Sequence, residues 1–185
     1  RTTARERPTA DILASGMPCE ICDDTYWKPI EVNGVRRVVR CDCWRDSIGQ
    51  QRLADANIPR RYQHCTIATF SAYNESLERA AAQARRLAEA FPALTRGLFL
   101  EGQPGVGKTH LAVAVLKQVI QTAGARGLFY DTRDLLRLIR STYDPSIRTT
   151  ELEILRPVMA ADLLVLDDLG AEKTSEWVEE TMNLI

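Results

Sequence analysis

The sequence lacks any long apolar run. Among its 185 residues the longest purely apolar stretches, such as residues 111–116, are much shorter than the run of about 18 residues that suggests a membrane-spanning helix. The chain also opens without a charged segment followed by an apolar one, which is the pattern of a secretory leader. We therefore predict a cytoplasmic protein with no membrane partner.

Net charge is almost absent as well. The chain has 24 Lys and Arg residues against 25 Asp and Glu residues, a formal net charge of -1. Contact with nucleic acid must then come from a local basic patch and not from the whole surface. Hydrophobic residues make up 45% and charged residues 26%, which is ordinary globular composition and excludes wholesale disorder. The length suits one domain with a small appendage.

Cysteine is scarce after the first 43 residues, and this early segment holds four of the chain's 5 cysteines. Residues 26–32 and 35–40 are β-prone and flank Asn33-Gly34, a strong signal for a tight hairpin. The hairpin would bring two cysteine pairs together as a tetrahedral Zn²⁺ site. Free thiols, disulfides and a redox Cys-x-x-Cys are the alternatives, although a cytosolic chain disfavours disulfides. The four predicted zinc ligands are Cys19, Cys22, Cys41 and Cys43.

The remaining cysteine, Cys65, has no partner at metal-ligand spacing. We expect a plain packed or exposed thiol there, although His64 lies beside it. Residues 44–56 predict a short helix and residues 57–61 a linker, because Pro59 disfavours helix at the residue before it. These signals divide the chain into a zinc-binding module, residues 1–57, and a second domain, residues 58–185.

The second domain carries a phosphate-binding motif. A helix is predicted over residues 75–91 with Asn74 as its N-cap, then a short strand over 97–101, and a helix over 110–121. Between the last two lies G-x-x-x-x-G-K-T, whose glycines let backbone N–H groups surround the phosphates of ATP or ADP. Lys108 can reach the β- and γ-phosphates and Thr109 can ligate Mg²⁺. The predicted nucleotide site comprises Gly102, Gln103, Pro104, Gly105, Val106, Gly107, Lys108, Thr109 and His110, the side chain of the last being structural.

Two carboxylates follow a second candidate strand. After a strand at 127–131, a helix at 132–143 and a helix at 149–160 that Pro157 can kink, residues 163–166 are four apolar positions typical of a buried parallel strand. Asp167 and Asp168 end it, at the edge where open α/β sheets bind ligands. Asp167 is the predicted Mg²⁺-site residue, and Asp168 is predicted to polarise the attacking water. Asp168 and the phosphate-binding Lys108 are the predicted catalytic residues. The alternative is a strand-end turn with solvated acids.

The choice of nucleotide rests on a further absence. Asp167-x-x-Gly170 also fits the Mg²⁺ loop of GTPases, but the Asn-Lys-x-Asp motif that reads guanine is missing. The paired acids favour ATP.

Several segments together resemble the bacterial replicative helicase loaders of the DnaC/DnaI type, which are AAA+ ATPases. Besides the phosphate-binding motif, the segments are Ile58-Pro59-Arg60-Arg61-Tyr62, Leu163-Leu164-Val165-Leu166-Asp167-Asp168-Leu169-Gly170-Ala171-Glu172, and the Cys19-x-x-Cys22-Asp23-Asp24-Thr25 and Cys41-Asp42-Cys43 elements. The last two look like the N-terminal zinc module of the DnaI-like branch. Two residues depart from the usual pattern: many zinc knuckles have Gly where Asp23 stands, and many relatives have Gly where Tyr26 stands.

This resemblance implies an α/β fold: a P-loop NTPase (AAA+) core with a parallel sheet and a small N-terminal zinc-binding β-hairpin module. The core is expected to be incomplete at its C-terminus, because sensor, arginine-finger and lid elements would lie beyond Ile185. We therefore expect this chain to bind nucleotide and to hydrolyse it slowly by itself.

The resemblance also implies partners. The zinc module would dock on the hexameric replicative helicase, and the AAA+ domain would bind ATP and single-stranded DNA and assemble with further copies. The matching DNA-binding stretch contains Arg133, Arg137, Arg140 and Tyr143. The three arginines share one helix face and suit phosphate contact beside a stacking aromatic ring. A solvated face balanced by neighbouring aspartates is the alternative.

Two other functions fit the same motifs. An IstB-like transposition helper ATPase has a similar core, usually without the Cys-rich module. A non-enzymatic zinc-ribbon adaptor would bind its nucleotide for structural reasons alone.

Overall fold

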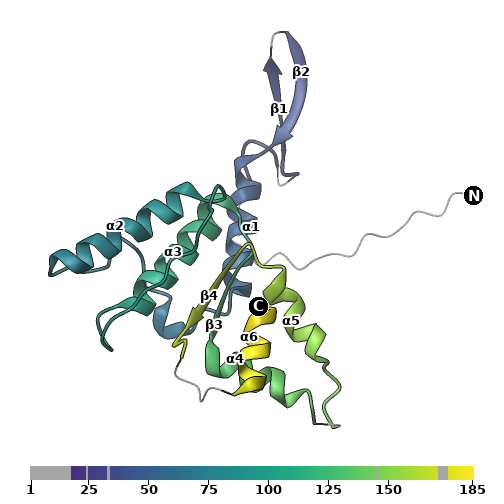
Figure 1. Ribbon diagram of the computed structural model, residues 1–185. Helices are drawn as coiled ribbons and strands as arrows, with labels where there is room; N and C mark the ends of the chain where they lie inside the picture. Colours follow the sequence, from purple (N-terminus) through teal and green to yellow (C-terminus); the bar gives the residue numbers. More distant parts are fainter. Residues whose placement is uncertain (1–17, 24, 33, 145, 171–174) are drawn as a thin grey trace, which may run out of the picture. The chain divides into compact units, whose positions relative to one another are not determined.

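The computed structural model describes residues 18–23, 25–32, 34–144, 146–170 and 175–185 (Figure 1). The chain forms two compact units that divide after Cys43. Each is described here by itself.

The first unit contains the predicted hairpin. Strand β1 (Trp27–Val32) pairs antiparallel with β2 (Val35–Arg40), with Trp27 opposite Arg40 and Val32 opposite Val35. Gly34, in the turn, has a φ of 76°, a conformation that glycine adopts without steric cost. The other predicted turn residue, Asn33, lies outside the described residues.

The second unit is an α/β layer structure around a parallel strand pair, as predicted. Strands β3 (Gly127–Asp131) and β4 (Leu163–Asp167) pair in parallel from Gly127 opposite Leu163 to Asp131 opposite Asp167. Their carboxyl ends therefore meet at one edge. The helices are α1 (Asp42–Asp55, which starts in the first unit), α2 (Glu75–Ala90), α3 (Lys108–Ala123), α4 (Thr132–Ser141), α5 (Glu151–Met159) and α6 (Glu176–Leu184).

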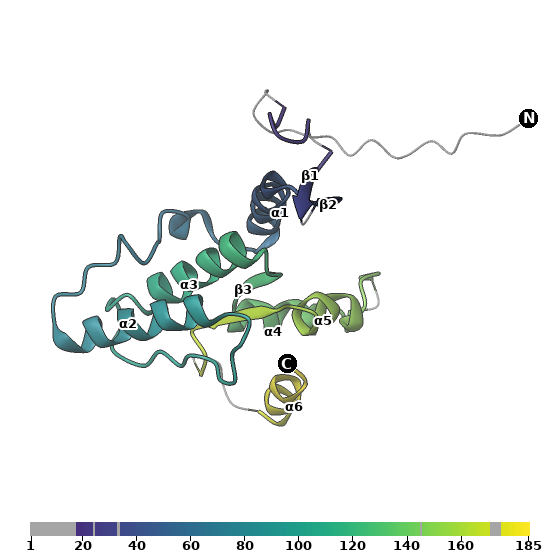
Figure 2. The same ribbon diagram turned by 90° about the horizontal axis from the view of Figure 1, so that it is seen from above.

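Successive side chains of the two strands point to opposite faces and pack into two separate hydrophobic cores. Phe129, Leu163 and Val165 pack with residues of α3 such as Leu116. Leu164 and Leu166 instead pack against α4 and α5, where Ile139 is fully buried. Figures 1 and 2 show α3 on one side of the strands and α4 and α5 on the other. This two-sided burial is what a parallel sheet requires.

The contacts of helix α1 differ from the sequence prediction, which placed the domain boundary after this helix, near Pro59. From Trp44 onward it belongs to the second unit. Gly49 is buried, and a Cβ added to it would lie 3.7 Å from the backbone of Gln121 at the end of α3. Leu53 packs on the core that Ala56 shares with α3. Close helix contact through a glycine, together with these apolar side chains, ties the segment to the P-loop unit.

The segment from Gly97 to Glu101 is not a strand, which corrects the prediction. Phe99 is 74% exposed, and no strand of the described residues pairs with this segment. A cavity of about 400 Å³ separates residues 97–102 from residues 163–169. The residues of β4 are half-buried, whereas the sequence predicted a fully buried strand. The cause is that β4 has a described neighbour, β3, on one edge only.

The other predicted elements differ in detail. Pro157 lies within α5, which continues to Met159. Helix α6 begins after Ser175, whose side chain caps it by accepting from the Val178 N–H. None of the described helices is long and apolar enough to cross a membrane.

Candidate nucleotide and metal sites

The phosphate-binding motif leads directly into α3. Gly107 precedes the helix with a φ of 93°, and Gly105 has a φ of 83°. These left-handed conformations turn the loop so that it meets the helix N-terminus, where free backbone N–H groups favour anions. The Lys108 ammonium donates to the carbonyl oxygens of Gly102 and Gln103 at 2.8 and 3.0 Å, so its charge lies against the loop.

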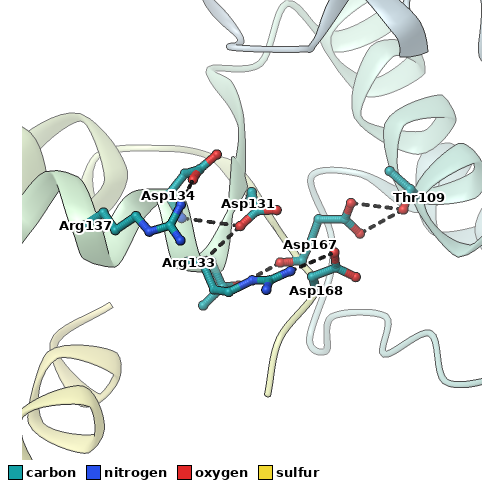
Figure 3. Close-up of polar contacts among 8 residues, drawn as sticks. Thr109, Asp131, Arg133, Asp134, Arg137, Asp167 and Asp168 are labelled. Atoms are coloured by element: carbon teal, nitrogen blue, oxygen red, sulfur yellow. Dashed lines mark hydrogen bonds and ion pairs between the residues drawn. The ribbon is translucent and has the colours of Figure 1, made fainter. Parts of the chain in front are cut away.

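The structure brings Thr109 and Asp167 together. The Thr109 hydroxyl, in the first turn of α3, lies 2.9 Å from both carboxylate oxygens of Asp167 at the end of β4 (Figure 3). A hydroxyl and a carboxylate are the hard oxygen donors that Mg²⁺ prefers, usually with waters completing its shell. Burial raises the pKa of Asp167, partly opposed by the Thr109 hydrogen bond, and the charge of Asp168 raises it further. A dication here would relieve that unfavourable charge.

The second carboxylate, Asp168, leaves the strand in a different direction. Its φ of 53° turns the chain at the strand end, and its Oδ2 lies 3.9 Å from a guanidinium nitrogen of Arg133 (Figure 3). The Thr132 hydroxyl donates to the Asp167 carbonyl at 2.8 Å, which ties the start of α4 to the end of β4. Asp168 is 56% exposed at its side chain, so water can reach it.

Two contributors to this site were not anticipated from the sequence. Asp131 caps α4 by accepting from the N–H groups of Arg133 and Asp134, and its charge helps to raise the pKa of Asp167. Phe70 lies against the phosphate-binding loop: a Cβ on Gly107 would approach its ring to 2.6 Å. An aspartate ending a predicted strand was a usable signal for Asp131, whereas nothing in the local pattern marks Phe70.

The predicted basic helix face borders a hollow. A cavity of about 380 Å³ is lined by Arg133, Leu136, Arg137, Arg140, Ser175, Trp177 and Val178. The Arg140 guanidinium lies 4.4 Å from the centroid of the Trp177 ring, and Trp177 Nε1 donates to the Tyr143 hydroxyl at 3.0 Å. The three arginines and Tyr143 thus gather beside a tryptophan that sequence spacing did not connect to them.

The neighbouring aspartates balance this face only in part. Arg137 pairs with Asp134 at 3.3 Å, whereas Asp131 caps the helix and Asp144 accepts hydrogen bonds from Ser146.

All four predicted zinc ligands converge in the first unit. The Sγ atoms of Cys19 and Cys41 lie 3.9 Å apart, those of Cys22 and Cys43 lie 3.2 Å apart, and all four lie within 4.8 Å of one another. Tetrahedral Zn²⁺ with bonds of about 2.3 Å sets its sulfur ligands about 3.8 Å apart. The donor set therefore fits Zn²⁺ with small side-chain adjustments.

The electrostatics of the cysteine cluster also favour a cation. Backbone N–H groups of Ile21 and Cys22 lower the pKa of Cys19 to about 7. Burial raises the pKa of Cys22 and of Cys43, so these thiols resist ionisation without a positive charge nearby. A bound dication stabilises all four thiolates together.

Two residues near the first cysteine pair adopt a backbone conformation that is uncommon for residues other than glycine. Asp23 and Tyr26 have φ values of 50° and 62°, the left-handed region that glycine favours. The Asp23 N–H donates to the Cys19 carbonyl at 2.7 Å, closing the turn that presents the two thiols.

Similar sequences and a similar structure exist among known proteins. A profile of the family described as "IstB-like ATP binding protein" matches residues 72–183. The replicative helicase loader DnaC of Escherichia coli is 27% identical over 136 residues, covering 74% of this chain and 55% of that protein. The replicative helicase loader DnaC of Buchnera aphidicola is 26% identical with the same coverage. The chain thus spans about half the length of these curated relatives.

A solved structure gives the same result. The crystal structure of the DnaC helicase loader superposes with a TM-score of 0.61 at 38% identity, covering 68% of this chain and 70% of that one. Of the residues that carried the resemblance in the sequence, Asp24, Ala171 and Glu172 lie outside the described residues. The profile covers more than half of the chain, and the chain therefore belongs to the IstB-like ATP-binding family, together with the DnaC helicase loaders.

Proposed function

We propose that this chain is the zinc module and the ATP-binding core of a replicative helicase loader. The observation that carries the proposal is the Thr109 hydroxyl placed 2.9 Å from the Asp167 carboxylate, directly beside the phosphate-binding loop. The relatives that are named replicative helicase loaders support the choice of process.

The residues divide the work at the nucleotide. Lys108 would neutralise the β- and γ-phosphates, while Thr109 and Asp167 would hold Mg²⁺. Asp168, whose side chain is exposed at the end of β4, would orient the attacking water. Bound Mg²⁺ supplies the charge that offsets the developing negative charge on the phosphates.

Two substitutions test these roles. Lys108→Ala should weaken ATP binding severely, because it removes the cation that faces the phosphates. Asp168→Asn should bind ATP as the wild type does and slow hydrolysis, since it keeps the shape and loses the anion. Binding is measured with a fluorescent ATP analogue and turnover by phosphate release. If Asp168→Asn bound ATP no better than Lys108→Ala, these assignments would be wrong.

The Cys-rich module is proposed to dock on the hexameric helicase. Exposed apolar side chains support this role: Ile21, Trp27, Val35 and Val38 are between 46% and 64% exposed. Trp27 and Val38 lie on the same hairpin face, and β2 adds three arginines. An apolar surface edged by positive charge suits a partner with an apolar, acidic patch.

A pull-down separates the candidate functions. The full chain should retain the replicative helicase of its host, and Val38→Asp should abolish retention without changing ATP binding. Glu20→Ala, a change at an exposed position of the same unit and outside the hairpin, is the control. Failure of the wild-type chain to retain the helicase would favour the IstB-like transposition helper. ATP binding without turnover by the complete protein would favour the adaptor.

A contact with single-stranded DNA is proposed for the cavity between α4 and α6. Arginines beside a tryptophan and a tyrosine match the combination of phosphate contact and base stacking that single-strand binders use. Assembly with further copies through the ATPase domain remains part of the same proposal.

A further inference from the structure

Both histidines of the chain and its fifth cysteine meet in one place. His64 and Cys65 follow a short 3₁₀ helix (Arg60–Tyr62), and His110 lies in the first turn of α3. The chain has 2 histidines and 5 cysteines, and the other four cysteines form the cluster in the first unit. One ligand atom from each of the three residues lies within 4.8 Å of the other two.

The ligand atoms are held by different parts of the fold. The Cys65 sulfur lies 3.9 Å from His64 Nε2, and Cys65 itself is 2% exposed within the core that Val113 and Leu116 of α3 complete. The His64 and His110 rings meet edge to face with centroids 6.2 Å apart.

The His110 ring is fixed by polar partners. Its Nε2 lies 2.9 Å from the Thr66 carbonyl oxygen and 3.3 Å from the Thr69 hydroxyl. Hydrogen bonds of this kind, in which an imidazole N–H donates to a backbone carbonyl, commonly set the orientation of metal-ligating histidines. The segment 64–69 thus supplies two ligands and the support of the third.

The donor chemistry selects the ion. Two imidazoles and one thiolate are the ligands of Zn²⁺ and similar transition metals and do not suit Mg²⁺ or Ca²⁺. Cys65 is buried, His110 is half-buried and His64 is exposed. The three ligands therefore run from the core to the surface, and a fourth position can be filled by water.

We propose that His64, Cys65 and His110 bind a second Zn²⁺ ion, with water as its fourth ligand. This ion fastens residues 64–70 to the start of α3. One of its ligands, His110, directly follows Thr109 in the chain. Phe70, at the end of the segment 64–70, contacts Gly107. The site therefore braces the phosphate-binding loop from outside and is separate from the cluster of four cysteines.

The metal content of the full chain tests this proposal. Purified wild type is saturated with Zn²⁺, dialysed, and its zinc per chain compared with that of His64→Gln. The variant should hold one equivalent less. His64 is exposed, so the fold should survive, as a thermal melt can verify. Gln63→Ala, at the neighbouring exposed position, should retain the wild-type amount. Equal zinc in wild type and His64→Gln would overturn the proposal.

Hydrogen exchange gives a second, independent measurement. Amides of residues 64–70 should exchange more slowly when the second equivalent of Zn²⁺ is added to the wild type. The same addition should leave these amides unchanged in His64→Gln. Protection that appears equally in the variant, or in neither protein, would contradict the proposed bridge.

Discussion

At the scale of single residues, Asp167 carries a charge that the fold does not stabilise by itself. Burial is the main cause of its raised pKa, and the Thr109 hydroxyl only partly compensates. A carboxyl group with a raised pKa in the folded state stabilises the fold when protonated. That contribution is present below the unfolded pKa of about 3.9 and is lost as pH rises through the folded pKa.

Asp167→Asn should therefore stabilise the chain near neutral pH in the absence of nucleotide and Mg²⁺. The gain in melting temperature should shrink as the pH falls toward about 4, where the wild-type carboxyl is also neutral. Thermal denaturation at several pH values measures both proteins.

The control for this experiment has the opposite sign. Hydrogen bonds from the backbone and side chain of Ser146 lower the pKa of Asp144, so Asp144→Asn should destabilise most at neutral pH and less as the pH falls. An Asp167→Asn variant that melted below wild type at pH 7 and equalled it at low pH would refute the proposed burial of charge.

Residues whose chemistry is local could be placed in the fold from the sequence. Lys108 and Thr109 stand in a fixed spacing, and Asp167 and Asp168 end an apolar strand, so their positions followed from motif and context. Phe70 and His110 acquire their contacts across long chain separations. No spacing rule brings such residues together, because the packing of α3 against the preceding loop decides it.

At the scale of elements, the loop before α3 offers a matched pair of glycines. Gly105 and Gly107 both have positive φ, and an alanine at either position would cost roughly 1 kcal/mol or more in backbone strain. The two differ in their surroundings. A Cβ on Gly105 meets no atom within 4 Å, whereas one on Gly107 would approach the Phe70 ring to 2.6 Å.

Gly107→Ala should consequently lower stability more than Gly105→Ala. Phe70 also packs on the core that α2 and α3 share, so Phe70→Ala has a cost of its own. This substitution should cost less in the Gly107→Ala background than in the wild type, because it removes the ring that the new methyl group would meet. Urea denaturation of Gly105→Ala, Gly107→Ala, Phe70→Ala and the double variant measures these differences in unfolding free energy. Equal losses for the two glycine variants would show that Phe70 does not restrict the loop.

The helices α4 and α6 allow a test of DNA contact at the same scale. Arg137→Ala should weaken binding of single-stranded DNA and reduce the salt dependence of log K by about 0.7, the value for one lost phosphate contact. Trp177→Ala should weaken binding by about 1–3 kcal/mol with little change in salt dependence, because it removes stacking and not charge. Binding is followed by fluorescence anisotropy with an oligonucleotide at several salt concentrations.

Arg86→Ala, an exposed arginine on α2, serves as the control and should leave DNA binding unchanged. An equal effect of Arg86→Ala and Arg137→Ala would indicate diffuse attraction in place of a defined site.

Element prediction failed where pairing partners decide the outcome. Residues 97–101 have a strand-like composition, yet a strand also needs a hydrogen-bonded neighbour, and the described residues supply none. By contrast, the Asn74 cap of α2 was predictable, since its side chain accepts from the Leu77 N–H within the same turn.

At the scale of the whole molecule, the chain divides after Cys43, the last of the predicted zinc ligands. Pro59 and the composition around it predicted a boundary near that proline. The contacts of Gly49 and Leu53 instead join α1, which precedes Pro59, to the second unit. Helix packing of this kind depends on which apolar face finds a partner, and the linear pattern does not contain that information.

The division predicts that the two units lose structure independently. Cys22→Ser removes one ligand of the proposed zinc site in the first unit. The described part of that unit has two strands and few buried side chains, so we expect it to depend on the metal for stability. The second unit keeps its own cores on both faces of β3 and β4. Limited proteolysis should therefore cleave residues 18–43 much faster in Cys22→Ser, while ATP affinity stays within about twofold of wild type, a change below 0.5 kcal/mol.

The substitution is preferable to a chelator, because a chelator would also remove a metal from His64 and Cys65. Lys108→Ala is the reciprocal control and should lose ATP binding while residues 18–43 stay protected. Loss of ATP binding in Cys22→Ser would mean that the nucleotide site depends on the zinc module for its fold.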